Sequence, residues 1–176
     1  MRVTGAWSEA EAGAFLDEAR VPIRLACHTP SGHLWMLSLW YAWVDGDAVE
    51  DADGGDVAEE GKENATPELR CATSADADVV AYLRNDPAVA FEVSTNDPPY
   101  RGVRGHGTVR IDPDTDKALL RSLFDRYLGG TDNRLGDRLL DPDREEVRLR
   151  IDPERLHSWD FSGRMRDVAA GRDGGE

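Results

Sequence analysis

Lysine is almost absent from this chain. Only Lys62 and Lys117 occur among its 21 basic residues, against 35 acidic residues in a total of 176. The resulting net charge of −14 argues against binding to DNA or RNA, because neutralising phosphates needs clustered Lys and Arg. An anionic membrane surface is disfavoured for the same reason.

Long apolar runs and cysteine are also scarce. No run approaches the 18 or more apolar residues of a membrane-spanning helix, and the N-terminus has no apolar segment typical of a secretory signal. Cys27 and Cys71 are too few for a disulfide framework, so we expect two reduced thiols. The sequence therefore predicts a cytoplasmic protein.

The acidity is of a particular kind, since Asp outnumbers Glu by 22 to 13 and Arg replaces nearly all Lys. Short carboxylates keep a surface hydrated in concentrated salt, where charge repulsion is screened over about 3 Å at 1 M. A GC-rich genome would favour Arg over Lys but would not supply 35 acids. We therefore predict a halophilic protein from a salt-accumulating organism.

The first third of the chain predicts a helix, two strands and an acidic insertion. Ser8 and Glu11 form a capping box, and a strand follows over 23–29. Segment 33–44, HLWMLSLWYAWV, alternates as one strand that is apolar on both faces, as in a barrel wall covered by a second subunit or a helix. Residues 45–68 carry ten acids and one lysine, which predicts a solvated loop rather than a calcium loop, because the ligand register is absent.

The rest of the chain reads as short strands separated by helices. We expect strands over 69–73, 88–95, 102–111, 146–151 and 156–161, and helices over 75–86, 115–128 and 133–140, the first of them capped by Ser74. Residues 166–176 are expected to form a disordered tail, which leaves 1–165 as one domain. The pattern is mainly β with α decorations and favours a small antiparallel barrel.

Two places offer chemistry for an anionic ligand. Thr73 and Ser74 enter a predicted helix, where hydroxyls and free N–H groups suit a phosphate, although an ordinary helix cap is the simpler explanation. Arg101 and Arg104 flank a Gly-rich strand after Tyr100 and offer bidentate forks, unless they only pair with surface carboxylates. The run GVRGHG lies inside a strand and not at a strand-to-helix turn, so it is not a dinucleotide fingerprint.

Three motifs occur in an order that resembles a known family: IRLACHTPSGHLWMLSLWYAW, LRCATSADADVVAYLRNDPAVAFEV and PPYRGVRGHGTVRI. Together they are similar to the FMN-binding split-barrel family typified by pyridoxamine 5'-phosphate oxidase, over roughly residues 21–161. The resemblance implies a six-stranded antiparallel Greek-key split β-barrel. It also implies a homodimer with two flavins bound at the subunit interface and a small-molecule substrate.

The resemblance also implies which residues would hold FMN or, alternatively, a deazaflavin. The strand segment around the isoalloxazine ring would offer backbone hydrogen bonds, a hydroxyl pair would lie near the phosphate, and a further strand would contribute from the neighbouring part of the cleft. Residue by residue, these are Leu37, Ser38, Leu39 and Trp40 for the ring, Thr73 and Ser74 for the phosphate, and Arg101 and Arg104 from the further strand. No catalytic residue and no metal ligand are implied.

The chain departs from the family where the phosphate would bind. Asp76 and Asp78 stand where FMN-binding members carry basic residues, and like charges about 4 Å apart cost roughly 4 kcal/mol at an effective dielectric of 20. Arg24, Arg70, Arg101 or Arg104 would have to replace the clamp, or a counter-ion would, or the phosphate site is lost. The functions left open are an FMN-dependent oxidoreductase, a deazaflavin reductase, and a non-catalytic barrel that binds haem or nothing.

Overall fold

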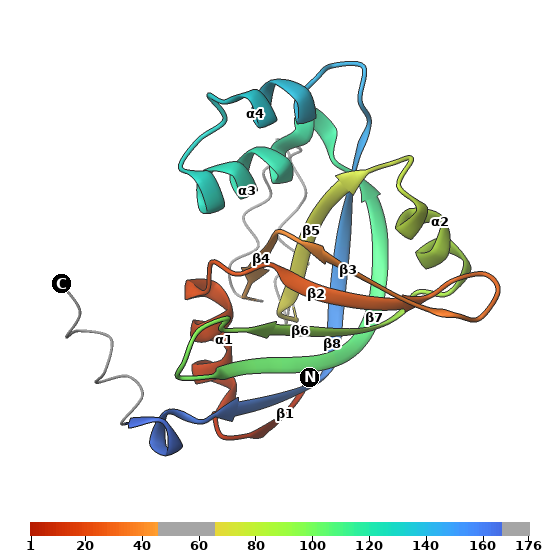
Figure 1. The fold of residues 1–176 in the computed structure, drawn as a ribbon. Coiled ribbons are helices and arrows are strands. Elements are labelled where there is room, and N and C mark those ends of the chain that lie inside the picture. The colour runs from red at the N-terminus through yellow and green to blue at the C-terminus, as the bar shows by residue number, and fades with distance from the viewer. Residues whose placement is uncertain (46–65, 167–176) are drawn as a thin grey trace, which may run out of the picture.

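A computed structural model describes residues 1–45 and 66–166. The described residues form one curled, mostly antiparallel sheet of eight strands with a few helices around it (Figure 1). The sheet order is β3-β2-β6-β7-β8-β5-β4, and β1 pairs with β8 in parallel. The elements in chain order are β1 (Arg2–Gly5), α1 (Glu9–Glu18), β2 (Ile23–His28), β3 (Leu34–Leu39), β4 (Tyr41–Val44), β5 (Glu68–Ser74), α2 (Asp78–Asn85), β6 (Ala88–Ser94), β7 (Arg101–Pro113), α3 (Ala118–Leu128), α4 (Arg134–Leu139) and β8 (Glu146–Asp160).

One segment of chain connects the two end strands of the curled sheet, and its pairing partner changes along the way. β3 and β4 lie at opposite ends of the sheet order although only Trp40 separates them in sequence. Leu39 pairs with Ile23 of β2, whereas Tyr41 pairs with Cys71 of β5. The prediction of a single strand over 33–44 is therefore wrong, because the backbone leaves one neighbour at Trp40 and joins another.

The core fills the inside of the curled sheet with alternate residues of its strands. Val89, Phe91 and Val93 of β6 are buried, as the period of two predicted. Leu16 of α1 and Val80 of α2 are fully buried and join the same core. Alternation thus decided which face of β6 turned inward, as it did for β2 with Ile23, Leu25 and Cys27 buried.

The strand count differs from the six that were expected. Segments 146–151 and 156–161 belong to one 15-residue strand, β8, and a register shift between His106 and Gly107 of β7 accommodates its middle. The short N-terminal strand β1 was not anticipated, because its four residues show no clear alternation. The Greek-key connection stays a prediction.

Helix boundaries were predicted well where a local cap exists. The capping box of α1 is confirmed, since Ser8 Oγ accepts from the Glu11 N–H and the Ser8 N–H donates to Glu11 Oε2 at 2.8 Å. The expected cap at Ser74 is wrong, because Ser74 still belongs to β5 and α2 begins only at Asp78. α3 ends at Leu128, as predicted, with Gly129 as its C-cap, but it begins at Ala118 rather than at residue 115.

The acidic insertion is shorter than the predicted 45–68. Glu68 opens β5, is 4% exposed and hydrogen-bonds to three arginines, so it is not a solvated loop residue. Residues 46–65 of the insertion and 167–176 of the predicted tail lie outside the described part of the chain. Of the helices that the structure describes, none is both long and apolar enough to cross a membrane.

Candidate functional site

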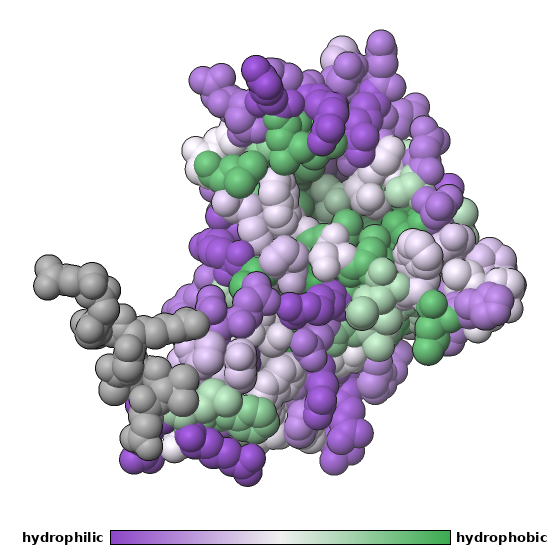
Figure 2. Space-filling model, viewed as in Figure 1, coloured by the Kyte–Doolittle hydropathy of each residue, from purple (hydrophilic) through white to green (hydrophobic). Residues whose placement is uncertain are grey.

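A hollow of about 300 Å³ opens where β3 and β5 diverge. It is lined by Ser38 and Leu39 of β3 and by Trp40, the residue after this strand. Ala72 and Thr73 of β5 line it as well, and four leucines of α3 and α4 form its opposite wall. Figure 2 shows the surface hollowed beneath the α3–α4 pair, with hydrophobic residues exposed inside. We call this space the split hollow. It brings together four of the eight residues that the sequence assigned to a cofactor.

The position of Trp40 is fixed by α3. Its indole ring stacks on Tyr127, with ring centroids 5.3 Å apart and 9° between the planes, and meets Phe124 edge-on at 5.4 Å. The Tyr127 hydroxyl in turn lies 3.3 Å from the backbone nitrogen and oxygen of Tyr41. The helix therefore holds the chain at the point where it changes strand partner.

β3 contributes a free backbone edge beside the split hollow. It is the terminal strand of the sheet order, so one of its edges has no strand partner among the described residues. Edge strands present unpaired N–H and C=O groups to any molecule that approaches. Leu37, also assigned to the cofactor, lies on this strand and packs partly against the core rather than lining the hollow.

The expected anion site at a helix N-terminus does not form. Ser74 pairs with Glu146 in register, and α2 begins four residues later, after a turn in which the Ala77 N–H donates to the Ser74 carbonyl. The Ser74 hydroxyl therefore lies on a strand, away from the first turn of α2. Thr73 alone of the hydroxyl pair lines the split hollow, which has Arg144 as its cation.

Arg101 and Arg104 lie apart from the split hollow. Arg101 is exposed at the start of β7, with its guanidinium 6.0 Å from the Phe15 ring centroid. Arg104 lines a different hollow of about 550 Å³ on the outer face of the sheet, where its guanidinium lies 5.4 Å from the Trp159 ring. Within one chain these arginines and Thr73 do not share a site.

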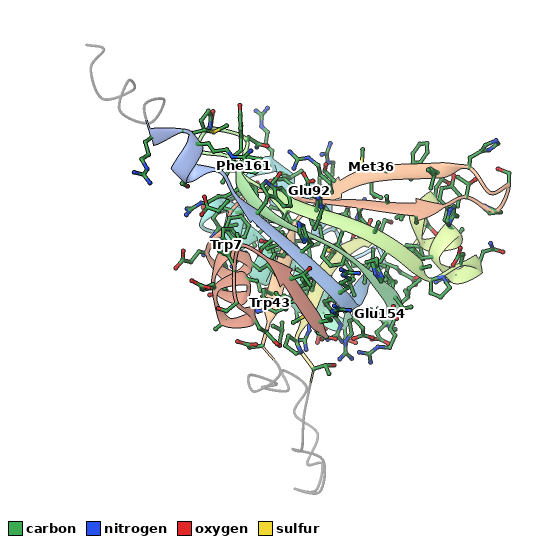
Figure 3. The ribbon with its side chains drawn as sticks, turned by 90° about the horizontal axis from the view of Figure 1, so that it is seen from below. Trp7, Met36, Trp43, Glu92, Glu154 and Phe161 are labelled. Atoms are coloured by element: carbon green, nitrogen blue, oxygen red, sulfur yellow. The ribbon has the colours of Figure 1, made fainter. Side chains whose placement is uncertain are left out.

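This outer groove combines an apolar floor with alternating charge. Register places Arg24, Glu92, Arg104 and His157 side by side across four strands, and Arg24 Nη1 lies 3.5 Å from Glu92 Oε1. In Figure 3, Met36 and Glu92 project from the same side of the sheet. Sequence reasoning missed His157 and Arg155 in this groove, because which strands are neighbours was unknown. The remaining lining residues are Ala26, Ala90, Phe91 and Gly105.

A third hollow of about 820 Å³ adjoins the split hollow and is more polar. Both are lined by Arg144 and Glu146, so the two spaces meet at this ion pair. We call the larger space the cationic hollow, because Arg84, Lys117 and Arg121 line it as well. No sequence pattern joins these four cations, which come from α2, α3 with the turn before it, and the loop that precedes β8.

Two titratable groups close to the split hollow, Cys71 next to Ala72 and Tyr127 stacked on Trp40, stay neutral near pH 7. Burial raises the pKa of the Cys71 thiol to about 12 and also raises the pKa of the Tyr127 phenol. A thiol that stays protonated is a poor nucleophile, so Cys71 has a packing role. The chemistry that the hollow supports is therefore binding of an apolar ring system beside polar backbone groups.

Comparisons with known proteins agree with this geometry. No protein-family model and no curated protein matches the sequence. Among solved structures, a conserved hypothetical protein from Mycobacterium tuberculosis is similar at 26% identity and a TM-score of 0.63, covering 88% of this chain and 86% of that one. An F420 reductase is similar at 25% identity and a TM-score of 0.57, covering 80% of this chain and 92% of that one.

More distant structures share the fold alone. A FAD-binding protein from Mesorhizobium loti is 19% identical, with a TM-score of 0.54, and covers 86% of this chain and 93% of its own. A protein from Listeria innocua described as a pyridoxamine 5'-phosphate oxidase, at 11% identity, and the haem storage protein from Vibrio cholerae, at 16%, have TM-scores of 0.53 and 0.52. The shared architecture is a split barrel.

Proposed function

The chain has the split-barrel fold of the flavin-binding proteins related to pyridoxamine 5'-phosphate oxidase, and from this premise we propose that it is an FMN-binding oxidoreductase acting on a small molecule. One observation carries the proposal. Ser38, Leu39 and Trp40 from one segment and Thr73 from another line a single hollow beside a free strand edge. Apolar pockets with a few convergent polar groups are typical of cofactor sites.

Each part of the split hollow suits a part of a flavin. The free edge of β3 over 37–40 offers backbone N–H and C=O groups to the polar rim of the isoalloxazine ring. Leu39 and the leucines of α3 and α4 offer apolar contacts to its faces, and Thr73 offers a hydroxyl. The flavin, when bound, supplies hydride transfer, while the protein binds it, orients it and excludes water.

A homodimer completes this proposal. Leu34 and Met36 on β3 are 78% and 67% exposed, and Trp35 is also exposed, so the strand presents an apolar surface. Exposed apolar patches mark interaction sites. A second copy seated on β3 would cover this surface, and it offers a route by which Arg101 and Arg104 of one copy reach the cofactor of the other.

A deazaflavin is the second candidate cofactor. The observation that favours it is the similarity to the F420 reductase, which is closer in identity than the FAD-binding neighbour. A deazaflavin ring has the same shape and would use the same hollow. The proposed reaction would then be reduction by a deazaflavin rather than by FMN.

The first test is the visible spectrum of protein purified in molar salt, followed by titration with FMN and with a deazaflavin. We expect bound flavin absorbance, and we expect Ser38→Trp to abolish it by filling the hollow. Ser122→Trp is the matched control, because Ser122 is exposed on α3 and does not line the hollow. A parent protein that binds neither cofactor would overturn the proposal and leave the non-catalytic barrel, with haem as the next ligand to titrate.

The dimer is tested separately by light scattering after size exclusion. The parent protein is expected to elute as a dimer and Met36→Asp as a monomer, since a charge in an apolar contact opposes association. A monomeric parent at micromolar concentration would remove the dimer from the proposal without affecting the flavin titration.

A further inference from the structure

We propose that the cationic hollow holds the phosphate of the cofactor, with Lys117 and Arg121 as the main contacts and Arg84 and Arg144 in support. This inference rests on the proposed function and names the residues that take the anionic end of the same ligand. It replaces the start of α2 as the phosphate site, and none of the arginines that the sequence offered as substitutes takes part.

The first argument is continuity. The split hollow has apolar walls around Leu39 and Trp40, whereas the cationic hollow is more polar, and the two meet at Arg144 and Glu146. A molecule with a flat apolar ring and a charged tail would extend from the first space into the second. The split hollow has a volume of about 300 Å³ and the cationic hollow a volume of about 820 Å³.

The second argument is that these cations keep donors free. Lys117 Nζ donates to the Asp141 backbone carbonyl, which leaves two of its three N–H groups. Arg121 uses Nε for the Asp116 carbonyl at 3.3 Å, which leaves its terminal nitrogens. Within the described part of the chain, neither forms an ion pair with a carboxylate.

Unpaired cations in one hollow are notable in a chain of net charge −14. Lys117 is one of only two lysines, and Arg84 also lines the hollow without an ion pair among the described residues. Arginine forks match the geometry of phosphate oxygens, and lysine supplies a point charge. The chemistry that satisfies such a group of donors is a phosphate.

Of the four carboxylates that line the hollow, only Glu146 pairs with one of its cations, Arg144. Asp114 is buried and accepts the N–H groups of Leu119 and Leu120 at 3.0 Å, and Glu146 is buried against Arg144. Both are therefore engaged inside the fold. Asp116 and Glu145 lie exposed at the rim, where solvent screens their repulsion of an anion.

The local backbone sets the two main cations on one side of α3. Lys117 is the N-cap residue of this helix, Arg121 follows four residues later, and both line the same hollow. Asp116 and Lys117 both adopt left-handed φ values of 55°, which makes the sharp entry into α3. Asp76 and Asp78 do not line the cationic hollow, although their neighbour Ala75 does.

The test compares FMN with riboflavin, which has the same ring system and no phosphate. In the parent protein we expect FMN to bind more tightly than riboflavin. In Lys117→Gln/Arg121→Gln we expect FMN affinity to fall by about 10- to 100-fold, as for lost charge-assisted hydrogen bonds, with riboflavin affinity unchanged. Arg138→Gln, an exposed change on α4 outside the hollow, is the matched control and should alter neither affinity.

The outcomes separate this inference from the proposed function. Equal affinity for FMN and riboflavin in the parent, or equal losses of both in the variant, would overturn the phosphate site while leaving flavin binding intact. If neither flavin binds, the proposed function fails, and dialysis equilibrium with inorganic phosphate decides the inference alone. The parent should then bind phosphate more tightly than the variant, and equal binding would overturn the inference.

Discussion

The indole of Trp40 lies parallel to the phenol ring of Tyr127, at a centroid distance of 5.3 Å and an interplanar angle of 9°. Trp40 lies where the chain passes from β3 to β4, and Tyr127 lies on α3, the helix that lines the split hollow. The stack therefore connects the strand junction to this helix. The Tyr127 hydroxyl also lies 3.3 Å from the backbone carbonyl oxygens of Val21 and Tyr41, either of which can accept its single proton. The pair therefore couples the stability of the junction to the shape of the split hollow.

Truncation of this stack tests that coupling. Trp40→Ala should lower the free energy of unfolding by about 3 kcal/mol, the lower end for a large aromatic side chain, because Trp40 is only partly buried. Trp40→Phe should lower it much less. Urea unfolding followed by far-UV circular dichroism measures both, and equal losses in the two variants would show that ring stacking is not what stabilises the junction.

Alkaline pH should destabilise the fold through Tyr41. Burial raises the pKa of Tyr41 well above its usual value near 10, and its hydroxyl donates to the Leu16 carbonyl at 2.7 Å. The stability that the protonated phenol contributes is fully present below pH 10. As the pH rises further the unfolded state loses its proton first, so stability falls by up to about 1.4 kcal/mol per pH unit.

The matching experiment is thermal unfolding between pH 8 and pH 11. Tyr41→Phe removes the titrating group and should flatten the decline above pH 10, although it also removes one hydrogen bond and lowers stability at pH 8. A decline of unchanged slope in Tyr41→Phe would assign the alkaline loss to other groups, of which Tyr127 is the first to examine because burial raises its pKa too.

Glu68 anchors the cations on the outer face of β5, β7 and β8. It is nearly buried, and its carboxylate bonds Arg70 Nε at 2.5 Å, Arg150 Nε at 3.0 Å and Arg110 Nη2 at 3.2 Å. Glu68→Gln removes the one charge that, among the described residues, all three share. It should cost about 2–3 kcal/mol, because Glu68 is nearly buried while its partners are only partly buried. Urea denaturation gives this value directly.

The control for Glu68 is an exposed carboxylate on the same strand system. Glu154 lies 3.6 Å from His106, and both side chains are mostly exposed, so Glu154→Gln should change stability by less than about 1 kcal/mol. Similar losses for the two variants would mean that burial of Glu68 does not strengthen its interactions.

Salt should stabilise this protein. With a net charge of −14, repulsion among surface carboxylates opposes the compact state in dilute buffer and is screened at molar salt. We expect the melting temperature to rise steadily from 0.1 M to 3 M KCl and the far-UV signal of a folded barrel to weaken on desalting. A melting temperature independent of salt would contradict the halophilic prediction.

Much of the local structure could be predicted because it depends on near neighbours in sequence. Alternation placed Trp35, Leu37, Leu39, Tyr41 and Trp43 on one face. In the structure the last two are buried and Leu37 and Leu39 pack against the same core, whereas Trp35 is exposed. That face is the same on both sides of Trp40, so the alternation carried no sign of the break there. The break was missed because alternation does not show which strands pair. Leu39 pairs with Ile23 and Tyr41 with Cys71, and both partners are distant in sequence.

The candidate site divides in the same way. The sequence, through its motifs, pointed to Ser38, Leu39, Trp40 and Thr73, which line one hollow. It also grouped Arg101 and Arg104 with them, which the single chain keeps apart. No sequence pattern could indicate the cations of the cationic hollow, because α2, α3 and the loop before β8 come together only in the folded structure.

The sequence by itself determined the charge of the surface, the capping box of α1 and the inward face of the main strands, because each depends on composition or on residues a few positions apart. Only the tertiary structure decided where the barrel splits and which cations gather beside the split. Strand partners are chosen by burial of the whole core, and residues as distant as Arg84 and Arg144 become neighbours only after that choice is made.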